Sequence, residues 1–136
     1  MEHDGKVGGR ILTQSIFKGM EGVFIPVKNP AKSAEWYEEK LGFLLLYQEA
    51  EAAVMKISES SQTVVCLVRT DNHQPMCFPD NQFGVGKYYN FIPQDFEETY
   101  RALVEKDVSV GPVGGEGEMK YFTFYDLDGN PLGVCN

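Results

Sequence analysis

The feature that most constrains the fold is an internal repeat of one pattern, β-α-β-β-β, on either side of a polar linker. Alternating apolar residues predict the strands, and apolar residues three or four positions apart predict one helix in each half. The first half contains a predicted strand at Gly22–Val27, a helix at Ala31–Leu41, and strands at Phe43–Glu49, Ala52–Ser58 and Thr63–Arg69. The second half contains a predicted strand at Tyr88–Ile92, a helix that begins after Asp95, and strands at Val110–Val113, Lys120–Tyr125 and Leu132–Cys135.

Both predicted helices begin at residues suited to capping. Asn29 can act as N-cap, and Pro30 follows it at a position where a missing N–H costs nothing. Asp95 and Glu98 form a capping-box pattern with Asp in place of Ser or Thr. Gly42 is predicted to end the first helix. The buried stripe of the second helix is predicted to comprise Phe96, Tyr100, Leu103 and Val104.

The repeat predicts an α+β fold: two tandem βαβββ modules that form a cupped mixed sheet with the helices on its outer face. We expect one domain at residues 20–136, with modules at 20–69 and 87–136 and a linker at 70–86. Residues 1–19 are expected to be an N-terminal arm or a leader that is not native, and Ile11–Phe17 could form an edge strand or exchange between chains.

The composition of the chain argues against some classes of binding partner and indicates a cellular compartment. The net charge of −8 argues against nucleic acid, which requires a basic face. No apolar run approaches the roughly 20 residues of a membrane-spanning helix. The three cysteines are odd in number and share no short spacing, so neither a disulfide framework nor a Cys-x-x-Cys metal site is indicated. We therefore expect a cytoplasmic protein with reduced thiols and no membrane partner.

Strand parity predicts which side chains face away from the helices, where a pocket is expected. The residues predicted to face the helices are Val23, Ile25, Tyr89, Phe91, Phe122, Phe124, Leu132 and Val134. From the opposite face we select as ligand-binding candidates Phe24, Cys66, Tyr88, Asn90, Tyr121, Thr123 and Tyr125. This mixture of rings, hydroxyls and one amide suits a flat or aromatic small molecule. The alternative is that the same residues fill the space or pack a dimer.

Two segments carry a family resemblance. Asn29–Tyr37, followed by Lys40–Phe43, is similar to the signature D-x-x-x-S-x-x-F-Y…LGF, and Phe124–Leu132 is similar to F-x-D-P-D-G-N-x-x. Together they resemble the vicinal-oxygen-chelate superfamily, which includes glyoxalases, extradiol dioxygenases, fosfomycin-resistance enzymes and bleomycin-resistance proteins. The resemblance covers Met20–Asn136 and indicates the fold more strongly than any one activity.

The resemblance also implies where a metal would be held. Metal-dependent members use four side chains, typically His and Glu, and the corresponding positions here are Gly22, Cys66, Tyr88 and Gly133. Glycine has no side chain to donate, so this set does not suit a divalent ion. A shift of one residue adds only one carboxylate and no imidazole, and the histidines lie at positions 3 and 73, in the leader and the linker. We expect no metal and no other cofactor. The two glycines either leave volume where the metal would lie or allow close backbone packing.

The leading hypothesis is a metal-free small-molecule-binding protein, similar to the bleomycin-resistance branch, which holds an aromatic or apolar ligand and forms a homodimer. One alternative is a lyase, isomerase or thiol-transfer enzyme that acts through Tyr88, Cys66 or Tyr121 in the same cavity. Another is a protein-binding scaffold. The sequence favours binding over catalysis, because Cys66 has no aligned His and is expected to be a buried apolar thiol. Gly114–Gly117 is expected to be a flexible rim of the pocket.

Overall fold

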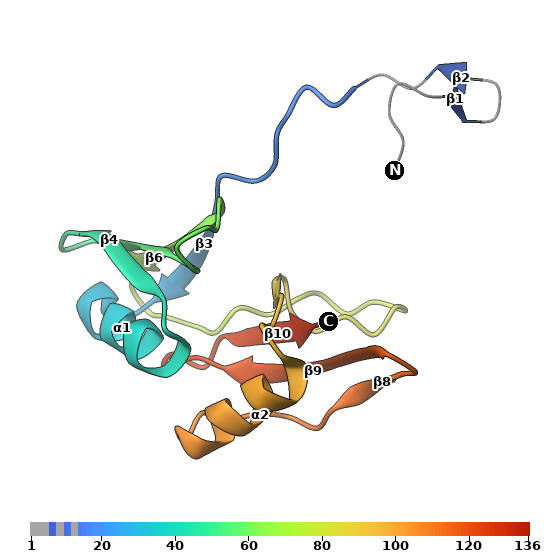
Figure 1. Cartoon of the computed structure of the whole chain (residues 1–136). Coiled ribbons are helices and arrows are strands. Elements are labelled where there is room, and N and C mark those ends of the chain that lie inside the picture. Colours follow the sequence, from blue (N-terminus) through green and yellow to red (C-terminus); the bar gives the residue numbers. More distant parts are fainter. Residues whose placement is uncertain (1–5, 8–9, 12–13) are drawn as a thin grey trace.

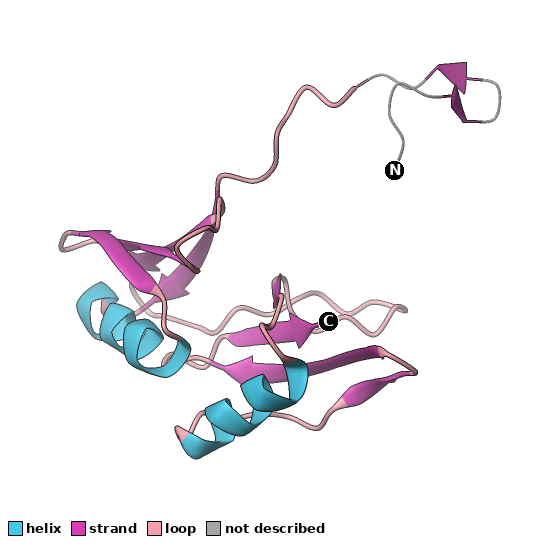
Figure 2. Ribbon diagram, in the orientation of Figure 1, coloured by secondary structure: helices cyan, strands magenta, loops and turns pink. Residues whose placement is uncertain are grey.

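The computed structural model describes residues 6–7, 10–11 and 14–136, and two similar modules account for most of its helices and strands (Figures 1 and 2). The N-terminal module contains β3 (Gly22–Val27), α1 (Pro30–Trp36), the π-helical turn η1 (Tyr37–Leu41), β4 (Leu44–Gln48), β5 (Ala52–Lys56) and β6 (Val64–Arg69). The C-terminal module contains β7 (Asn90–Phe91), α2 (Phe96–Glu105), β8 (Gly114–Glu116), β9 (Met119–Tyr125) and β10 (Pro131–Cys135). Ahead of both, β1 (Lys6–Val7) pairs with β2 (Arg10–Ile11).

Each module forms its own four-stranded sheet, and the two sheets have the same topology. The strand orders are β3-β6-β5-β4 and β7-β10-β9-β8, with the first strand parallel to the last and the other pairs antiparallel. The predicted α+β fold of tandem βαβββ modules is therefore confirmed. The strands that begin the modules lie near each other: the Tyr89 hydroxyl, just before β7, donates to the Phe24 carbonyl of β3 at 3.2 Å.

Both helices lie on the same side of the two sheets (Figure 1), as the alternation of side chains predicts. The residues predicted to face the helices are buried or pack against the core, and Ile25, Phe122 and Leu132 are at most 1% exposed. Asn29 and Asp95 cap the helices as predicted, each accepting a backbone N–H three residues later. The other face of each sheet carries no helix, and we call it the open face.

A buried polar contact joins the modules. The Tyr37 hydroxyl donates to Asp126 Oδ2 at 2.6 Å, and both side chains are buried. Asn130 Nδ2 donates to the same carboxylate oxygen at 3.0 Å and to the Pro26 carbonyl at 2.8 Å. Burial, and then the nearby Asp126 carboxylate, raise the pKa of Tyr37 well above its ordinary value. The Asp-Leu-Asp-Gly-Asn turn thus serves as the main polar connection between the modules.

The C-terminal module departs from the sequence-based predictions at three points. Val110–Val113 is not a strand; Val110 makes a single bridge to Phe124, and β8 begins at Gly114. The expected flexible rim at Gly114–Gly117 is instead half of a hairpin with β9. Gly115 has φ of +112° and a Cβ there would lie 2.1 Å from the Met119 carbonyl, so glycine is required for pairing rather than for mobility. Val104, predicted to be buried, is 47% exposed.

The segments outside the modules contribute few elements. Residues 14–19 are exposed and lead away from the sheets (Figure 1), while the rest of the predicted arm lies partly outside the described residues. Residues 70–86 contain no helix or strand, yet they contact the C-terminal module: His73 Nε2 lies 3.2 Å from the Asp128 carbonyl oxygen, so this side chain is half-buried rather than free. Within the described ranges, no helix has the length and apolar character needed to cross a membrane.

Candidate ligand-binding site

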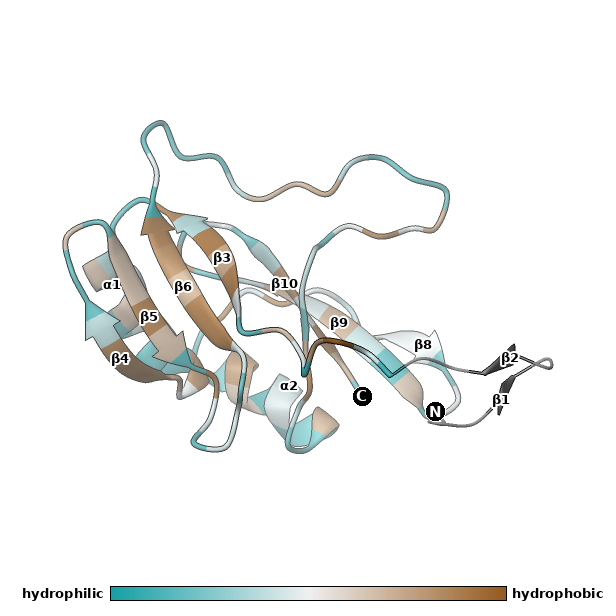
Figure 3. Cartoon of the chain, turned by 90° about the horizontal axis from the view of Figure 1, so that it is seen from above, coloured by the Kyte–Doolittle hydropathy of each residue, from teal (hydrophilic) through white to brown (hydrophobic). Residues whose placement is uncertain are grey.

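The predicted ligand-binding residues all lie on or beside the open face. Aromatic side chains dominate it: Phe24 is 69% exposed, Tyr88 50%, Tyr121 43% and Tyr125 40%. Cys66 and Thr123 are half-buried between neighbouring strands, and Asn90 is exposed. Figure 3 views the strands from this side, with the helices behind them. The face is open in the single chain, so a ligand can reach these groups without a conformational change.

On the N-terminal sheet, the residues that cross the open face in one row are mainly apolar. The strand register pairs Phe24 with Cys66, Cys66 with Val54, and Val54 with Tyr47. The hydropathy colouring shows β6 as hydrophobic along its length (Figure 3). The Tyr47 hydroxyl at the outer end of the row donates to Glu49 Oε2 at 2.9 Å. This row offers a ligand surface for packing and few hydrogen-bonding groups.

On the C-terminal sheet, the corresponding row is polar. Gly133 on β10 lies between Asn90 on β7 and Thr123 on β9. Tyr121 and Tyr125 lie two residues before and after Thr123, so they share its face of the sheet. The row therefore combines an amide and a hydroxyl with a phenol on either side.

The space next to Gly133 on the open face is filled by side chains of other residues. A Cβ on this residue would lie 2.0 Å from Asn90 Oδ1 and 2.2 Å from Lys87 Cε. The absence of a side chain thus lets Asn90 and Lys87 lie directly over β10. A Cβ on Gly22 would lie 3.0 Å from Val64 Cγ2 and 3.3 Å from the Val64 carbonyl oxygen. Close backbone packing, one of the two explanations considered for these glycines, agrees with the structure at Gly22, where the Val64 carbonyl is near. At Gly133 the neighbouring atoms belong to side chains, which occupy the space that either explanation would assign to a pocket or to backbone.

The Cys66 thiol is poorly suited to act as a nucleophile. Burial raises its pKa, and the carboxylates of Glu21 and Glu49 raise it further. A raised pKa keeps the sulfur protonated at neutral pH, whereas nucleophilic attack requires the thiolate. The expectation of a fully buried thiol is nevertheless too strong, since Cys66 is half-buried at the open face.

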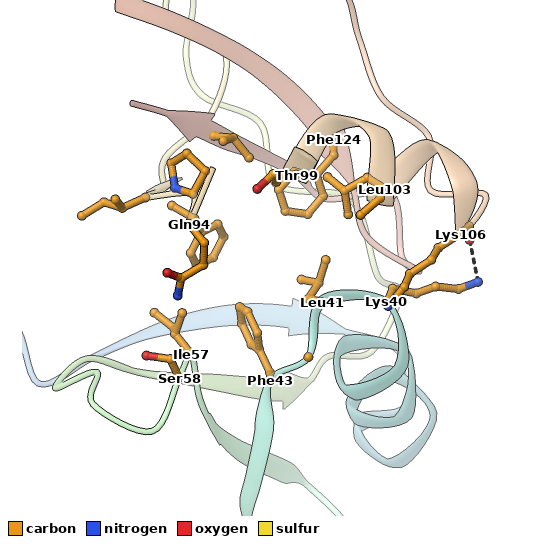
Figure 4. Close-up of a pocket in the computed structure, with 16 residues that line it drawn as sticks. Lys40, Leu41, Phe43, Ile57, Ser58, Gln94, Thr99, Leu103, Lys106 and Phe124 are labelled. Atoms are coloured by element: carbon orange, nitrogen blue, oxygen red, sulfur yellow. Dashed lines mark hydrogen bonds between the residues drawn. The ribbon is translucent and has the colours of Figure 1, made fainter. Parts of the chain in front are cut away.

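Two cavities lie where the modules meet. One, of about 650 Å³, is near the start of β3 and is lined by Met20, Thr63, Tyr88 and Asn90 among others. The other, of about 350 Å³, lies between η1 and α2 (Figure 4). Both include residues 91–94. Tyr88 and Asn90 are thus the members of the predicted set that also border a cavity.

The smaller cavity was not predicted, because its walls come from segments that are far apart in the sequence. Figure 4 shows Leu41 and Phe43 from one module facing Thr99 and Leu103 from the other. Periodicity marked such residues only as helix-facing and could not show that two modules leave space between them. Lys87 was missed for a similar reason: its proximity to Gly133 depends on strand pairing across 46 residues.

The four positions implied for a metal do not supply a suitable donor set. Gly22 and Gly133 have no donor side chain, and the raised pKa of Cys66 disfavours a thiolate ligand. In the part of the chain that the structure describes, no three or more His, Cys, Asp or Glu side chains are grouped so that they could hold an ion. The residues present therefore do not fit the divalent ion of the metal-dependent relatives.

Comparisons with known proteins agree with the fold. A family model described as the Glyoxalase/Bleomycin resistance protein/Dioxygenase superfamily matches residues 19–134. No curated protein matches the sequence. Among solved structures, a glyoxalase family protein from Enterococcus faecalis is 22% identical, with a TM-score of 0.70 over 90% of this chain and 100% of that one.

Two further structural relatives have more specific descriptions. TnmS3, an antibiotic binding protein from Streptomyces sp. CB03234, is 20% identical, with a TM-score of 0.71 over 90% of this chain and 98% of its own. FosX, a fosfomycin resistance protein from Listeria monocytogenes, is 16% identical, with a TM-score of 0.68 over 88% of this chain and 93% of its own. At these identities the likeness concerns the fold. With the family match across 19–134 and the repeated βαβββ topology, the chain belongs to the glyoxalase/bleomycin resistance protein/dioxygenase superfamily.

Proposed function

We propose that this protein is a metal-free, cytoplasmic small-molecule-binding protein that holds an aromatic or apolar ligand on the open face of its sheets. The observation that carries the proposal is the exposure of four aromatic side chains on that one face, namely Phe24, Tyr88, Tyr121 and Tyr125. Clustered exposed apolar surface is typical of binding sites, and aromatic rings bind flat ligands by stacking.

The polar groups on the same face support a small ligand over a protein partner. Asn90 and Thr123 can donate or accept hydrogen bonds between the aromatic rings, which is the usual division of roles in a ligand site. The adjoining cavity of about 650 Å³, which Tyr88 and Asn90 border, is within the usual size range for such sites. The description of TnmS3 as an antibiotic binding protein supports this class of function for the fold.

The residues at the four implied metal-ligand positions support binding without a metal. The properties of the Cys66 thiol do not favour an enzymatic function as the alternative. Two of the four implied ligand positions are glycine. A thiol-transfer reaction through Cys66 would require a lowered pKa, whereas burial and two carboxylates raise it.

We also propose a homodimer, with β4 as part of the contact. This edge strand exposes consecutive large apolar residues, including Leu46 at 54% and Tyr47 at 57%. Exposed apolar edges of this kind tend to pair with another chain. Sedimentation analysis should show a dimer that L46E converts to a monomer; a monomer in the wild type would contradict this part of the proposal.

Ligand binding can be tested with EDTA-treated protein and a panel of planar aromatic antibiotics and metabolites, using thermal shift followed by calorimetry. We expect at least one compound to raise the melting temperature and bind at one site per chain. Y125A should weaken that binding, while F83A, which removes a 90% exposed ring in residues 70–86, should not. Binding that appears only after Zn²⁺, Mn²⁺ or Fe²⁺ is added, or equal effects of Y125A and F83A, would contradict the proposal.

A further inference from the structure

The centre of the open face of the C-terminal sheet is built around Gly133. This residue is on β10, an inner strand, and its neighbours in register are Asn90 and Thr123. It is buried even though its face of the sheet carries no helix. Other side chains must therefore cover it from the open side.

Lys87 provides much of that cover. Its Cε lies 2.2 Å and its Cδ 2.9 Å from the place where a Gly133 Cβ would be. The aliphatic part of the side chain thus lies flat against β10, as lysine stems do on apolar surface. The ammonium is one bond beyond Cε, so it lies close to the open face of β10.

The charge of Lys87 is not neutralised by a carboxylate among the described residues. The ion pairs there involve Lys40 with Glu39, Arg69 with Glu51 and Asp71, and Lys120 with Glu97. Lys87 is half-buried, and its ammonium has no carboxylate partner among the described residues. In a chain of net charge −8, an unpaired cation at the centre of an aromatic face is unusual and creates a local site for an anion.

The groups around Lys87 define the ligand more closely. The Asn90 amide also lies over Gly133, and the Thr123 hydroxyl is on the adjacent strand. Tyr121 and Tyr125 flank Thr123 on the same face. A cation and two hydrogen-bonding groups suit an oxygen anion, and the tyrosines suit a planar ring attached to it.

We infer that the ligand of this face is an aromatic anion, a planar ring system bearing an acidic oxygen, and that Lys87 is the residue that selects its charge. This inference rests on the proposed binding function and adds the class of ligand. It assigns to Lys87 a role that the aromatic residues cannot perform, since they bind charged and neutral rings alike.

The test compares two probes that differ in charge and little else, 2-naphthoate and 2-naphthamide. Each is titrated into ¹⁵N-labelled protein, and the amide shifts of residues on β9 and β10 report both the affinity and the location. In the wild type we expect naphthoate to bind about tenfold more tightly than naphthamide, the usual scale of a charge-assisted hydrogen bond. Raising the salt concentration should reduce that difference.

Four variants separate charge from shape. K87M keeps an apolar stem of similar length, so it should lower naphthoate affinity about tenfold and leave naphthamide affinity unchanged. K87R keeps the charge and should retain the preference. K32Q removes an exposed lysine on α1, on the helix side, and is the matched control. G133A places a methyl group against the Lys87 stem, so it should reduce the preference without removing any charge.

The outcomes distinguish failure of the inference from failure of the proposed function. Equal affinities of the wild type for the two probes, or equal effects of K87M on both, would overturn the inference while leaving a binding site for aromatic molecules. If neither probe shifts the amides of β9 and β10, the open face is not a ligand site and both proposals fail. If G133A and K87M both reduce the preference and K32Q does not, the inference is supported.

Discussion

The two modules share a topology but differ in the chemistry of their open faces. Counting from the helix caps Asn29 and Asp95, Phe24 on β3 corresponds to Asn90 on β7. Across β6 the N-terminal row continues with Cys66, whereas across β10 the C-terminal row continues with Gly133. The N-terminal row offers an apolar surface for packing, whereas the C-terminal row supplies an amide and a hydroxyl, with Lys87 beside Gly133. A duplicated scaffold can therefore carry an apolar face on one half and a polar face on the other without a change in strand order.

The contact that joins the two halves offers the largest expected effect. Asp126 accepts hydrogen bonds from Tyr37, Asn130 and the Asp128 amide, and it is buried. D126A leaves these donors without their partner and should lower the free energy of unfolding by about 3 kcal/mol. Urea denaturation measures this, with D80A in the exposed segment 70–86 as the control. Equal stability of the two variants would show that the modules do not depend on this contact.

The same junction predicts a pH dependence. The pKa of Tyr37 is raised in the folded protein, so the unfolded chain loses this proton at a lower pH than the folded one. The stabilisation is complete below pH 10.0, the ordinary value for tyrosine, and is lost as the pH rises above it. Wild-type stability should therefore fall more steeply above pH 10.0 than that of Y37F, measured by urea titration. Parallel curves would show that Tyr37 is not coupled to the junction.

Aromatic residues lie in different surroundings on the two sheets, and replacing them should have a smaller effect, which is on ligand affinity. Tyr125 flanks the polar row, whereas Phe24 is part of the apolar row. Y125A should lower affinity for an aromatic ligand about fivefold, as expected for the loss of roughly 1 kcal/mol of ring stacking. F24A should lower affinity for charged and neutral ligands equally, because its row carries no cation. A selective effect of F24A on anions would break the proposed division between the sheets.

The two glycines allow a finer comparison. G22A directs a methyl group against Val64, including its carbonyl oxygen at 3.3 Å, which cannot move freely; we expect a loss of about 1 kcal/mol of stability. G133A meets the Asn90 amide oxygen and the stem of Lys87, which are side-chain atoms that can move aside. We expect its stability to remain within about 0.5 kcal/mol of the wild type. Thermal denaturation of both variants tests the difference, and the reverse order of stabilities would contradict it.

The sequence predicted the repeated elements well because each carries a local signal. Asn29-Pro30 and Asp95 begin the helices where expected, and period-two alternation identified the buried faces of β3, β9 and β10. The edge strand of the C-terminal sheet was harder to predict. Gly114–Glu116 became β8, while Val110–Val113 did not form a strand, because pairing with β9 rather than propensity decides which residues extend the sheet.

The candidate site could also be predicted only in part, because local features leave a signal in the sequence and long-range contacts do not. Parity placed Phe24, Tyr121 and Tyr125 on the open face, since the orientation of a side chain in a strand is a local property. The position of Lys87 over Gly133 and the cavities between the modules depend on long-range packing, which leaves no periodic trace.

The most direct measurement follows the amide spectrum of metal-stripped protein during titration with planar aromatic compounds, naphthoate among them. We predict saturable shifts that concentrate on Asn90, Thr123 and Gly133 and that are unchanged when EDTA is present. Shifts confined to the cavity between η1 and α2, or binding that requires an added divalent ion, would contradict the claim that the open face holds a ligand without a metal.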